Sequence, residues 1–155
     1  MRRGVRLGVD VGKVRVGLAR CDRDGLLATP LETVQRRGDQ LEPVLARILE
    51  LAAELEAIEL VVGLPIAMSG RDTPSTADAR AFAERLAEGP LPVRMVDERL
   101  TTVSAQAALH ASGRNTRGSR PVIDQVAAVI LLQHALDAER ARGVAPGALL
   151  DTKRK

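Results

Sequence analysis

Aromatic side chains are almost missing from this chain of 155 residues, which has no Trp, no Tyr and a single Phe, Phe82. Proteins that hold single-stranded nucleic acid usually stack the bases on several aromatic side chains. This chain cannot build such a stacking surface, so any binding of a polyanion must rely on phosphate contacts and shape. Arginine greatly outnumbers lysine, and its planar guanidinium suits paired contacts with phosphate oxygens.

Cysteine and long apolar runs are also scarce. The one cysteine, Cys21, has no partner for an internal disulfide, and the sequence has no Cys/His cluster typical of a zinc site. The longest unbroken apolar run, 126–132, is far too short to cross a bilayer. The N-terminal segment MRRGVRLGVD lacks the apolar stretch of a signal peptide. We therefore expect a cytoplasmic protein with no membrane segment.

The length and composition are those of one globular domain. Apolar residues make up 45% of the chain and charged residues 28%, which are ordinary values for a folded protein. A chain of this length has room for one sizeable core. We expect residues 1–142 to form the domain. Residues 143–155 contain Gly and Pro and end in TKRK, which predicts a flexible basic tail.

Charge is distributed unevenly, although the net charge is only +3. Residues 1–20 and 113–120 are rich in Arg, whereas residues 39–60 are rich in Asp and Glu. This polarity predicts a basic face turned toward a polyanion and an acidic face turned away from it. For any single block, a solvated charged surface is the alternative interpretation.

The hydrophobic pattern predicts a mixed α/β fold. Short β-like runs predict strands over 5–11, 15–21, 26–34, 58–63 and 92–96. Helical spacing of apolar residues predicts helices over 39–56, 102–111 and 121–142, and another that starts at Pro74 with Thr73 as its N-cap. This order implies a five-stranded mixed sheet flanked by helices, with a three-stranded antiparallel meander followed by two parallel strands.

Three acidic residues lie where such a fold would bring strand ends together. Asp10 is near the end of the first predicted strand, Glu98 follows the fifth, and Asp124 is in the first turn of the last helix. Ligand sites in these sheets form beyond the carboxyl ends of the parallel strands. Each residue alone has a plainer interpretation, because Asp and Gly form hairpin turns and acids favour helix N-termini.

Five stretches of the sequence, taken together, resemble one family. In chain order they are LGVDVGKVRVGLA (7–19), VVGLPIAMSG (61–70), FAERL (82–86), VDERLTT (96–102) and VIDQVAAVILLQ (122–133). Through them the chain is similar to the YqgF/RuvX family of ribonuclease H-like nucleases, which are related to the RuvC Holliday junction resolvases. The resemblance implies that Asp10, Glu98 and Asp124 are catalytic, metal-binding acids. It also implies a ribonuclease H-like fold and a role in trimming the precursor of 16S ribosomal RNA during ribosome biogenesis.

One loop departs from the family pattern. After Gly-Leu-Pro, members often carry an acid before the next Gly, whereas this chain has Met68 and Ser69 before Gly70. Asp72 and Asp97 are therefore the candidates for any fourth metal-site acid.

The candidate residues suit hydrolysis of phosphodiester bonds. Two divalent ions about 4 Å apart can activate water and stabilise the leaving oxygen, and oxygen-only ligands favour Mg²⁺ or Mn²⁺ over zinc. Three crowded carboxylates would repel one another strongly unless cations lie among them. Basic and hydroxyl side chains near the acids are predicted to bind the nucleic acid: Lys13, Arg15, Arg99, Thr101, Thr102, Arg114, Arg117 and Arg120.

Several functions stay open at this point. A ribosomal RNA nuclease would act on precursor RNA or on precursor ribosomal particles. A Holliday junction resolvase would act on branched DNA and would need two sites in a homodimer, and the sequence does not distinguish a monomer from a homodimer. An actin-like nucleotide-binding module shares the Asp-x-Gly turn, but such proteins use two domains and this chain has room for one. A catalytically inactive RNA-binding protein is the last alternative, and the three retained acids argue against it.

Overall fold

The computed structural model describes residues 1–100 and 120–150. Its strands are β1 (Arg6–Val11), β2 (Arg15–Cys21), β3 (Ala28–Gln35), β4 (Glu59–Leu64), β5 (Val93–Asp97) and β6 (Ala148–Leu150). Its helices are α1 (Glu42–Glu54), α2 (Pro74–Ala87) and α4 (Arg120–Arg142), with a short 3₁₀ turn at Glu98–Leu100. The predicted helix over 102–111 lies outside the described residues.

The strands form one mixed sheet in the order β3-β2-β1-β4-β5-β6. The first three strands are an antiparallel meander, since β2 pairs antiparallel with both β1 and β3. The next two strands run parallel to β1, because β4 pairs parallel with β1 and with β5. The predicted meander followed by two parallel strands is therefore confirmed.

The sixth strand is a difference from the prediction, which had five strands and a flexible tail over 143–155. β6 lies inside that tail and pairs antiparallel with β5. It is only three residues long and follows Gly147, whose backbone has a φ of +69°. A strand this short carries no alternating apolar pattern, so its pairing depends on the neighbouring edge of the sheet rather than on its own sequence.

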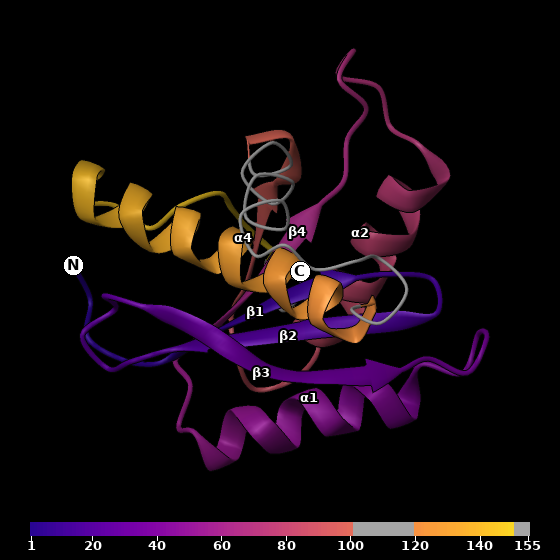
Figure 1. Cartoon of the computed structure of the whole chain (residues 1–155), viewed down its shortest axis with the longest axis horizontal. Helices are drawn as coiled ribbons and strands as arrows, with labels where there is room; N and C mark the ends of the chain where they lie inside the picture. The colour runs from indigo at the N-terminus through magenta and orange to yellow at the C-terminus, as the bar shows by residue number, and fades with distance from the viewer. Residues whose placement is uncertain (101–119, 151–155) are drawn as a thin grey trace.

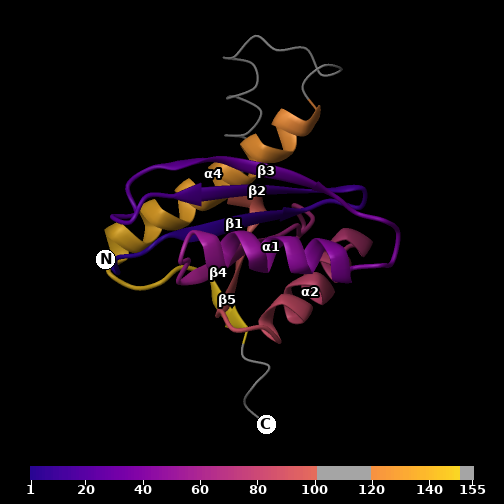
Figure 2. The ribbon, with the colours of Figure 1, turned by 90° about the horizontal axis from the view of Figure 1, so that it is seen from below.

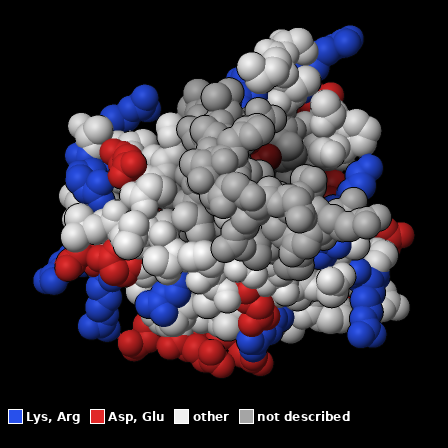
Figure 3. Space-filling view, viewed as in Figure 1, with Lys and Arg blue, Asp and Glu red and all other residues white. Residues whose placement is uncertain are grey.

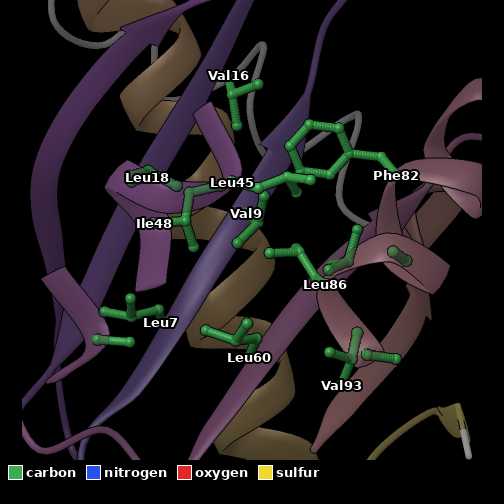
Figure 4. Close-up of a cluster of buried hydrophobic side chains, with 14 of the residues drawn as sticks. Leu7, Val9, Val16, Leu18, Leu45, Ile48, Leu60, Phe82, Leu86 and Val93 are labelled. Atoms are coloured by element: carbon green, nitrogen blue, oxygen red, sulfur yellow. The ribbon is translucent and has the colours of Figure 1, made fainter. Parts of the chain in front are cut away.

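Helices cover both faces of the sheet. α1 and α2 lie on one face and α4 lies on the other (Figures 1 and 2). Figure 4 shows the core beneath α1 and α2, where Ile48 and Phe82 pack around Val9 of β1. On the opposite face α4 packs closely on the backbone of β1 at Gly8. A Cβ added at Gly8 would lie 2.9 Å from the Ala128 carbonyl oxygen, so the missing side chain allows this approach.

The N-terminus of α2 is capped as predicted. The Thr73 hydroxyl accepts a hydrogen bond from the Thr76 backbone N–H at 3.2 Å, and the Thr76 hydroxyl accepts one from the Thr73 N–H at 2.9 Å. The buried Thr76 hydroxyl also contacts the Pro65 carbonyl oxygen, just after β4. The cap therefore fixes the start of α2 against the end of β4.

The carboxyl ends of the three parallel strands meet at one edge of the sheet. Val9 pairs with Val62, and Leu64 pairs with Asp97, the last residue of β5. Asp10 and Glu98 follow these paired positions directly. Among the described helices, none combines the length and apolar character needed to cross a membrane.

Candidate active site

Asp10 and Glu98 meet at the carboxyl edge of the sheet. Asp10 follows Val9, which packs toward α1 and α2, so the alternation of side chains along β1 turns Asp10 to the α4 face. Glu98 begins the 3₁₀ turn after β5, and its side chain is hydrogen-bonded to that of Asp10. The structure therefore brings together two of the three predicted acids.

The close approach of Glu98 depends on a glycine in β4. A Cβ added at Gly63 would lie 2.8 Å from both Cγ and Cδ of Glu98. Real Cβ atoms essentially never come that close, so any side chain at this position would displace the Glu98 carboxyl group. The Gly of the Gly-Leu-Pro sequence thus makes room for the acid pair, a role that the sequence analysis did not identify.

The two acids lie in an environment that opposes their ionisation. Burial, the hydrogen bond to Asp10 and the negative charges of Asp10 and Asp97 together raise the pKa of Glu98 from 4.5 to about 9. Near neutral pH the pair therefore shares a proton unless a cation takes the proton's place. This is the electrostatic condition that a divalent metal ion relieves.

The third acid is placed only through its helix. Asp124 belongs to α4, whose apolar face packs across β1 and β2. Its side chain is outside what the structure describes, as are Thr101, Thr102, Arg114 and Arg117. Among the described residues, no group of three or more acidic, His or Cys side chains converges. Arg120, predicted to be in a basic loop, is instead the first residue of α4.

The two candidates for a fourth acid are both paired with arginines. Asp97 accepts hydrogen bonds from the Arg99 guanidinium, the shortest at 2.6 Å, and this contact lowers the pKa of Asp97. Asp72 is exposed and forms an ion pair of 3.0 Å with Arg80 on α2. Arg99 itself, predicted to bind phosphate, is held by Asp97 in this structure.

Lys13 lies in the turn between β1 and β2, and Arg15 is the first residue of β2. The Gly12 N–H donates to the Arg15 carbonyl at 2.9 Å and closes the turn. A Cβ at Gly12 would lie 2.5 Å from that same carbonyl oxygen, so the tight turn requires glycine. Lys13 is exposed and Arg15 is half-buried, so two basic residues follow Asp10 closely in the chain.

The basic block over residues 1–20 does not form the single polyanion-facing surface predicted from sequence. Arg2 and Arg6 lie at the opposite edge of the sheet, where they bind Glu59 and Glu139 at 3.0 Å or less. Arg94 completes this cluster with a contact of 2.7 Å to Glu59. The prediction was wrong for Arg2 and Arg6 because their partners are distant in sequence.

The acidic face predicted over residues 39–60 is present along α1. Its Glu42, Glu50 and Glu54 are exposed. Figure 3 shows acidic side chains gathered along the edge of the molecule where α1 lies in Figure 1. Glu59 is the exception, since it is buried in the arginine cluster.

Comparisons with known proteins agree with this geometry. Residues 4–138 match the family described as "RuvX: Holliday junction resolvase". A protein of Clavibacter sepedonicus named "Putative pre-16S rRNA nuclease" is 63% identical over 155 residues, covering 99% of this chain and 96% of the relative. One of Leifsonia xyli subsp. xyli, with the same name, is 59% identical over 148 residues and covers 95% of this chain and 94% of the relative.

A solved structure shows the same fold at low sequence identity. It is described as Thermus thermophilus RuvC in complex with a Holliday junction substrate, and it superposes with a TM-score of 0.59 at 19% identity. The match covers 95% of this chain and 99% of that one. Nucleases of the RuvC and RuvX type depend in general on divalent metal ions and bind nucleic acid. The chain belongs to the RuvX family and is a nuclease with a ribonuclease H-like fold.

Proposed function

We propose that this nuclease uses Mg²⁺ or Mn²⁺ to hydrolyse phosphodiester bonds in the precursor of 16S ribosomal RNA, in the cytoplasm. The observation that carries the proposal is the hydrogen-bonded pair of Asp10 and Glu98 at the carboxyl edge of the sheet. The substrate is suggested by relatives with the name "Putative pre-16S rRNA nuclease", which align with nearly the whole chain.

The donor atoms at this edge fit a hard divalent cation. Asp10 and Glu98 offer only carboxylate oxygens, which Mg²⁺ and Mn²⁺ prefer over softer ligands. The raised pKa of Glu98 supports the same conclusion, because burial, the hydrogen bond to Asp10 and the negative charges of Asp10 and Asp97 all oppose ionisation of its carboxyl group. Asp10, Glu98 and Asp124 would hold the metal. When bound, the metal would supply an activated water and neutralise charge on the leaving oxygen.

The surrounding side chains would hold the nucleic acid. Lys13 lies in the turn that follows Asp10 and Arg15 begins β2, and both would bind the phosphate next to the scissile bond. Arg99 would exchange its contact with Asp97 for a contact with phosphate. Thr101, Thr102, Arg114, Arg117 and Arg120 would bind the backbone farther from the cut.

The second candidate function is resolution of Holliday junctions. It is favoured by the description of the matching family, which names that activity. A resolvase must cut two strands symmetrically, so this function requires a homodimer with two sites. A nuclease that trims one end of an RNA needs only one site and can be a monomer.

One experiment separates these functions. Purified protein is offered precursor 16S ribosomal RNA, free or in precursor ribosomal particles, and in parallel a four-way DNA junction. Each reaction contains Mg²⁺, Mn²⁺ or a chelator, and Asp10→Asn serves as the matched inactive control. The mass of the protein, alone and with each substrate, is measured by light scattering.

Metal-dependent cleavage of the RNA, faster than that of the junction and lost in Asp10→Asn, is the expected result. Symmetric cuts in the junction by a dimer, with the RNA left intact, would replace the proposed function with junction resolution. Binding of RNA without cleavage under any metal condition would identify an inactive RNA-binding protein instead.

A further inference from the structure

A buried arginine connects the β1–β2 turn to helix α2. Arg36 follows β3, and its Nη1 donates a hydrogen bond of 2.8 Å to the Gly12 carbonyl oxygen. The same guanidinium binds the Asp78 carboxylate of α2 through two contacts of 2.7 and 3.1 Å. One side chain therefore ties a turn that begins two residues after Asp10 to a helix on the α1/α2 side of the sheet.

Arg36 lies in a buried environment that is unfavourable for a cation. Its side chain is only 6% exposed, and its guanidinium carbon lies 5.6 Å from the centre of the Phe82 ring. Phe82 is the one aromatic residue of the chain. The Arg36 Nε is buried without a hydrogen-bond partner. Burying a cation with one unsatisfied donor costs free energy, and an apolar pair would fill the same space more cheaply.

Helix α2 is also tied to the strand on the other side of Asp10. The Thr76 hydroxyl contacts the Pro65 carbonyl just after β4, and β4 carries Gly63, over which Glu98 packs. The first turns of α2 thus contact both backbone segments that border the acid pair. Thr76 and Asp78 are two residues apart, so the two contacts come from one short stretch of rigid helix.

We propose that Arg36 is a positioning residue of the nuclease, which holds the β1–β2 turn on α2 so that Asp10 and Lys13 keep a fixed distance from Glu98. The inference rests on the proposed function, in which Asp10 and Glu98 bind the metal. Metal sites and transition states tolerate displacements of about 0.5 Å. A displacement of about 1 Å can reduce kcat about 100-fold.

The test compares variants that distinguish an effect on the position of Asp10 from an effect on the stability of the fold. Arg36→Met keeps an unbranched side chain at this position but removes the hydrogen bond to Gly12. The double variant Arg36→Met/Asp78→Leu also removes the carboxylate that Arg36→Met leaves unpaired, so an apolar pair restores much of the lost stability. Arg36→Lys keeps the charge but cannot make the paired contact with Asp78 while also reaching Gly12.

A matched control comes from α1. Arg47 binds Glu32 of β3 through two contacts of 2.8 and 2.7 Å, so it joins α1 to the strand that Arg36 follows. It does not contact the β1–β2 turn in any contact that the structure records for it. Arg47→Met therefore removes a similar arginine–carboxylate pair without freeing Asp10.

Two quantities are measured for each variant: kcat and KM on RNA, and the rise in melting temperature on adding Mn²⁺. We expect both Arg36→Met and the double variant to lose about 10- to 100-fold in kcat, with KM changed less than about twofold. Their Mn²⁺-induced rise in melting temperature should shrink. Arg36→Lys should show a smaller loss of kcat, and Arg47→Met should match the wild type in both measurements.

The positioning role is contradicted if the folded double variant keeps the wild-type kcat and the full response to Mn²⁺. If the double variant does not fold, Arg36→Lys decides in the same way, because wild-type values for it would also contradict the role. A wild-type protein that cuts neither RNA nor DNA would refute the proposed nuclease function instead. The Mn²⁺ response of the variants would still test whether Arg36 positions the acids.

Discussion

Both ends of the sheet hold a pair of acidic side chains, buried at the amino end and half-buried at the carboxyl end, but in opposite electrostatic settings. At the amino end Glu59 and Glu139 are surrounded by Arg2, Arg6 and Arg94. At the carboxyl end Asp10 and Glu98 face each other. Burial raises the pKa at both ends, yet the contacts from Arg2 reverse this effect and lower the pKa of Glu139 to about 2. Burial and Asp10 together raise that of Glu98 to about 9.

This contrast distinguishes a structural charge cluster from a functional one. The acids of the amino end have their counterions inside the fold, so the cluster is complete and fastens α4 to the ends of β1 and β4. At the carboxyl end the negative charges of Asp10 and Asp97 both raise the pKa of Glu98, while Arg99 is paired with Asp97. An acid pair that the fold assembles in this way gains most from a cation that arrives from solution.

The largest expected effect is on catalysis. Asp10→Asn and Glu98→Gln should each reduce cleavage of precursor RNA at least about 100-fold, the scale seen when one charge-stabilising group of a transition state is removed. Each substitution removes a proposed metal ligand and keeps the shape of the side chain. The check is a single-turnover cleavage assay in Mn²⁺ with equal amounts of folded protein. Wild-type rates for either variant would contradict the claim that the acids at the carboxyl end are functional and those at the amino end structural.

The next effect is on stability at the amino end. Glu139→Gln leaves the fully buried Arg6 without its carboxylate, and breaking a buried pair in this way costs about 3–5 kcal/mol of unfolding free energy. Far-UV circular dichroism in urea measures this loss without Trp. The exposed Glu50, which contacts Arg47, is the matched control, and Glu50→Gln should change stability by less than about 0.5 kcal/mol.

The smallest expected effect is the pH dependence of stability in chelator. Glu98 has a folded pKa of about 9, above its ordinary 4.5, so its protonation stabilises the fold fully below 4.5. That contribution is lost as the pH rises through 9. Glu139 behaves oppositely, because its folded pKa of about 2 gives stability that is present above 4.5 and lost as the pH falls toward 2.

Thermal melts of wild type and Glu98→Gln from about pH 5 to about pH 9 measure this difference. The wild type should lose more stability than the variant as the pH rises, and at the alkaline end the variant should melt at the higher temperature. Parallel melting curves for the two proteins would show that Glu98 ionises as an ordinary exposed acid.

Much of this arrangement was predictable from sequence, but for two different reasons. The strands over 5–11 and 15–21 and the capping of α2 by Thr73 were predicted from local patterns, and the structure confirms both. The meeting of Asp10 with Glu98 was predicted from the order of the strands, whereas their role as metal ligands was predicted only through the family resemblance. Locally, Asp10 is equally consistent with an ordinary hairpin turn.

The features that sequence did not predict all depend on contacts between distant residues. Gly63 matters because β5 ends beside it and delivers Glu98 over its missing side chain. Arg36 and Asp78 are 42 residues apart, and neither belongs to a motif. Arg6 and Glu139 are separated by 133 residues, so the sequence suggested a surface charge where the structure has a buried pair.

The most direct test of the central claim is to count the Mn²⁺ ions bound to the protein by electron paramagnetic resonance, without any nucleic acid. The account predicts saturable Mn²⁺ binding by the wild type, undiminished binding by Glu50→Gln, and strongly weakened binding by Asp10→Asn and Glu98→Gln. Equal Mn²⁺ binding by all four proteins would contradict it, because the acid pair at the carboxyl end of the sheet would then not be the metal site.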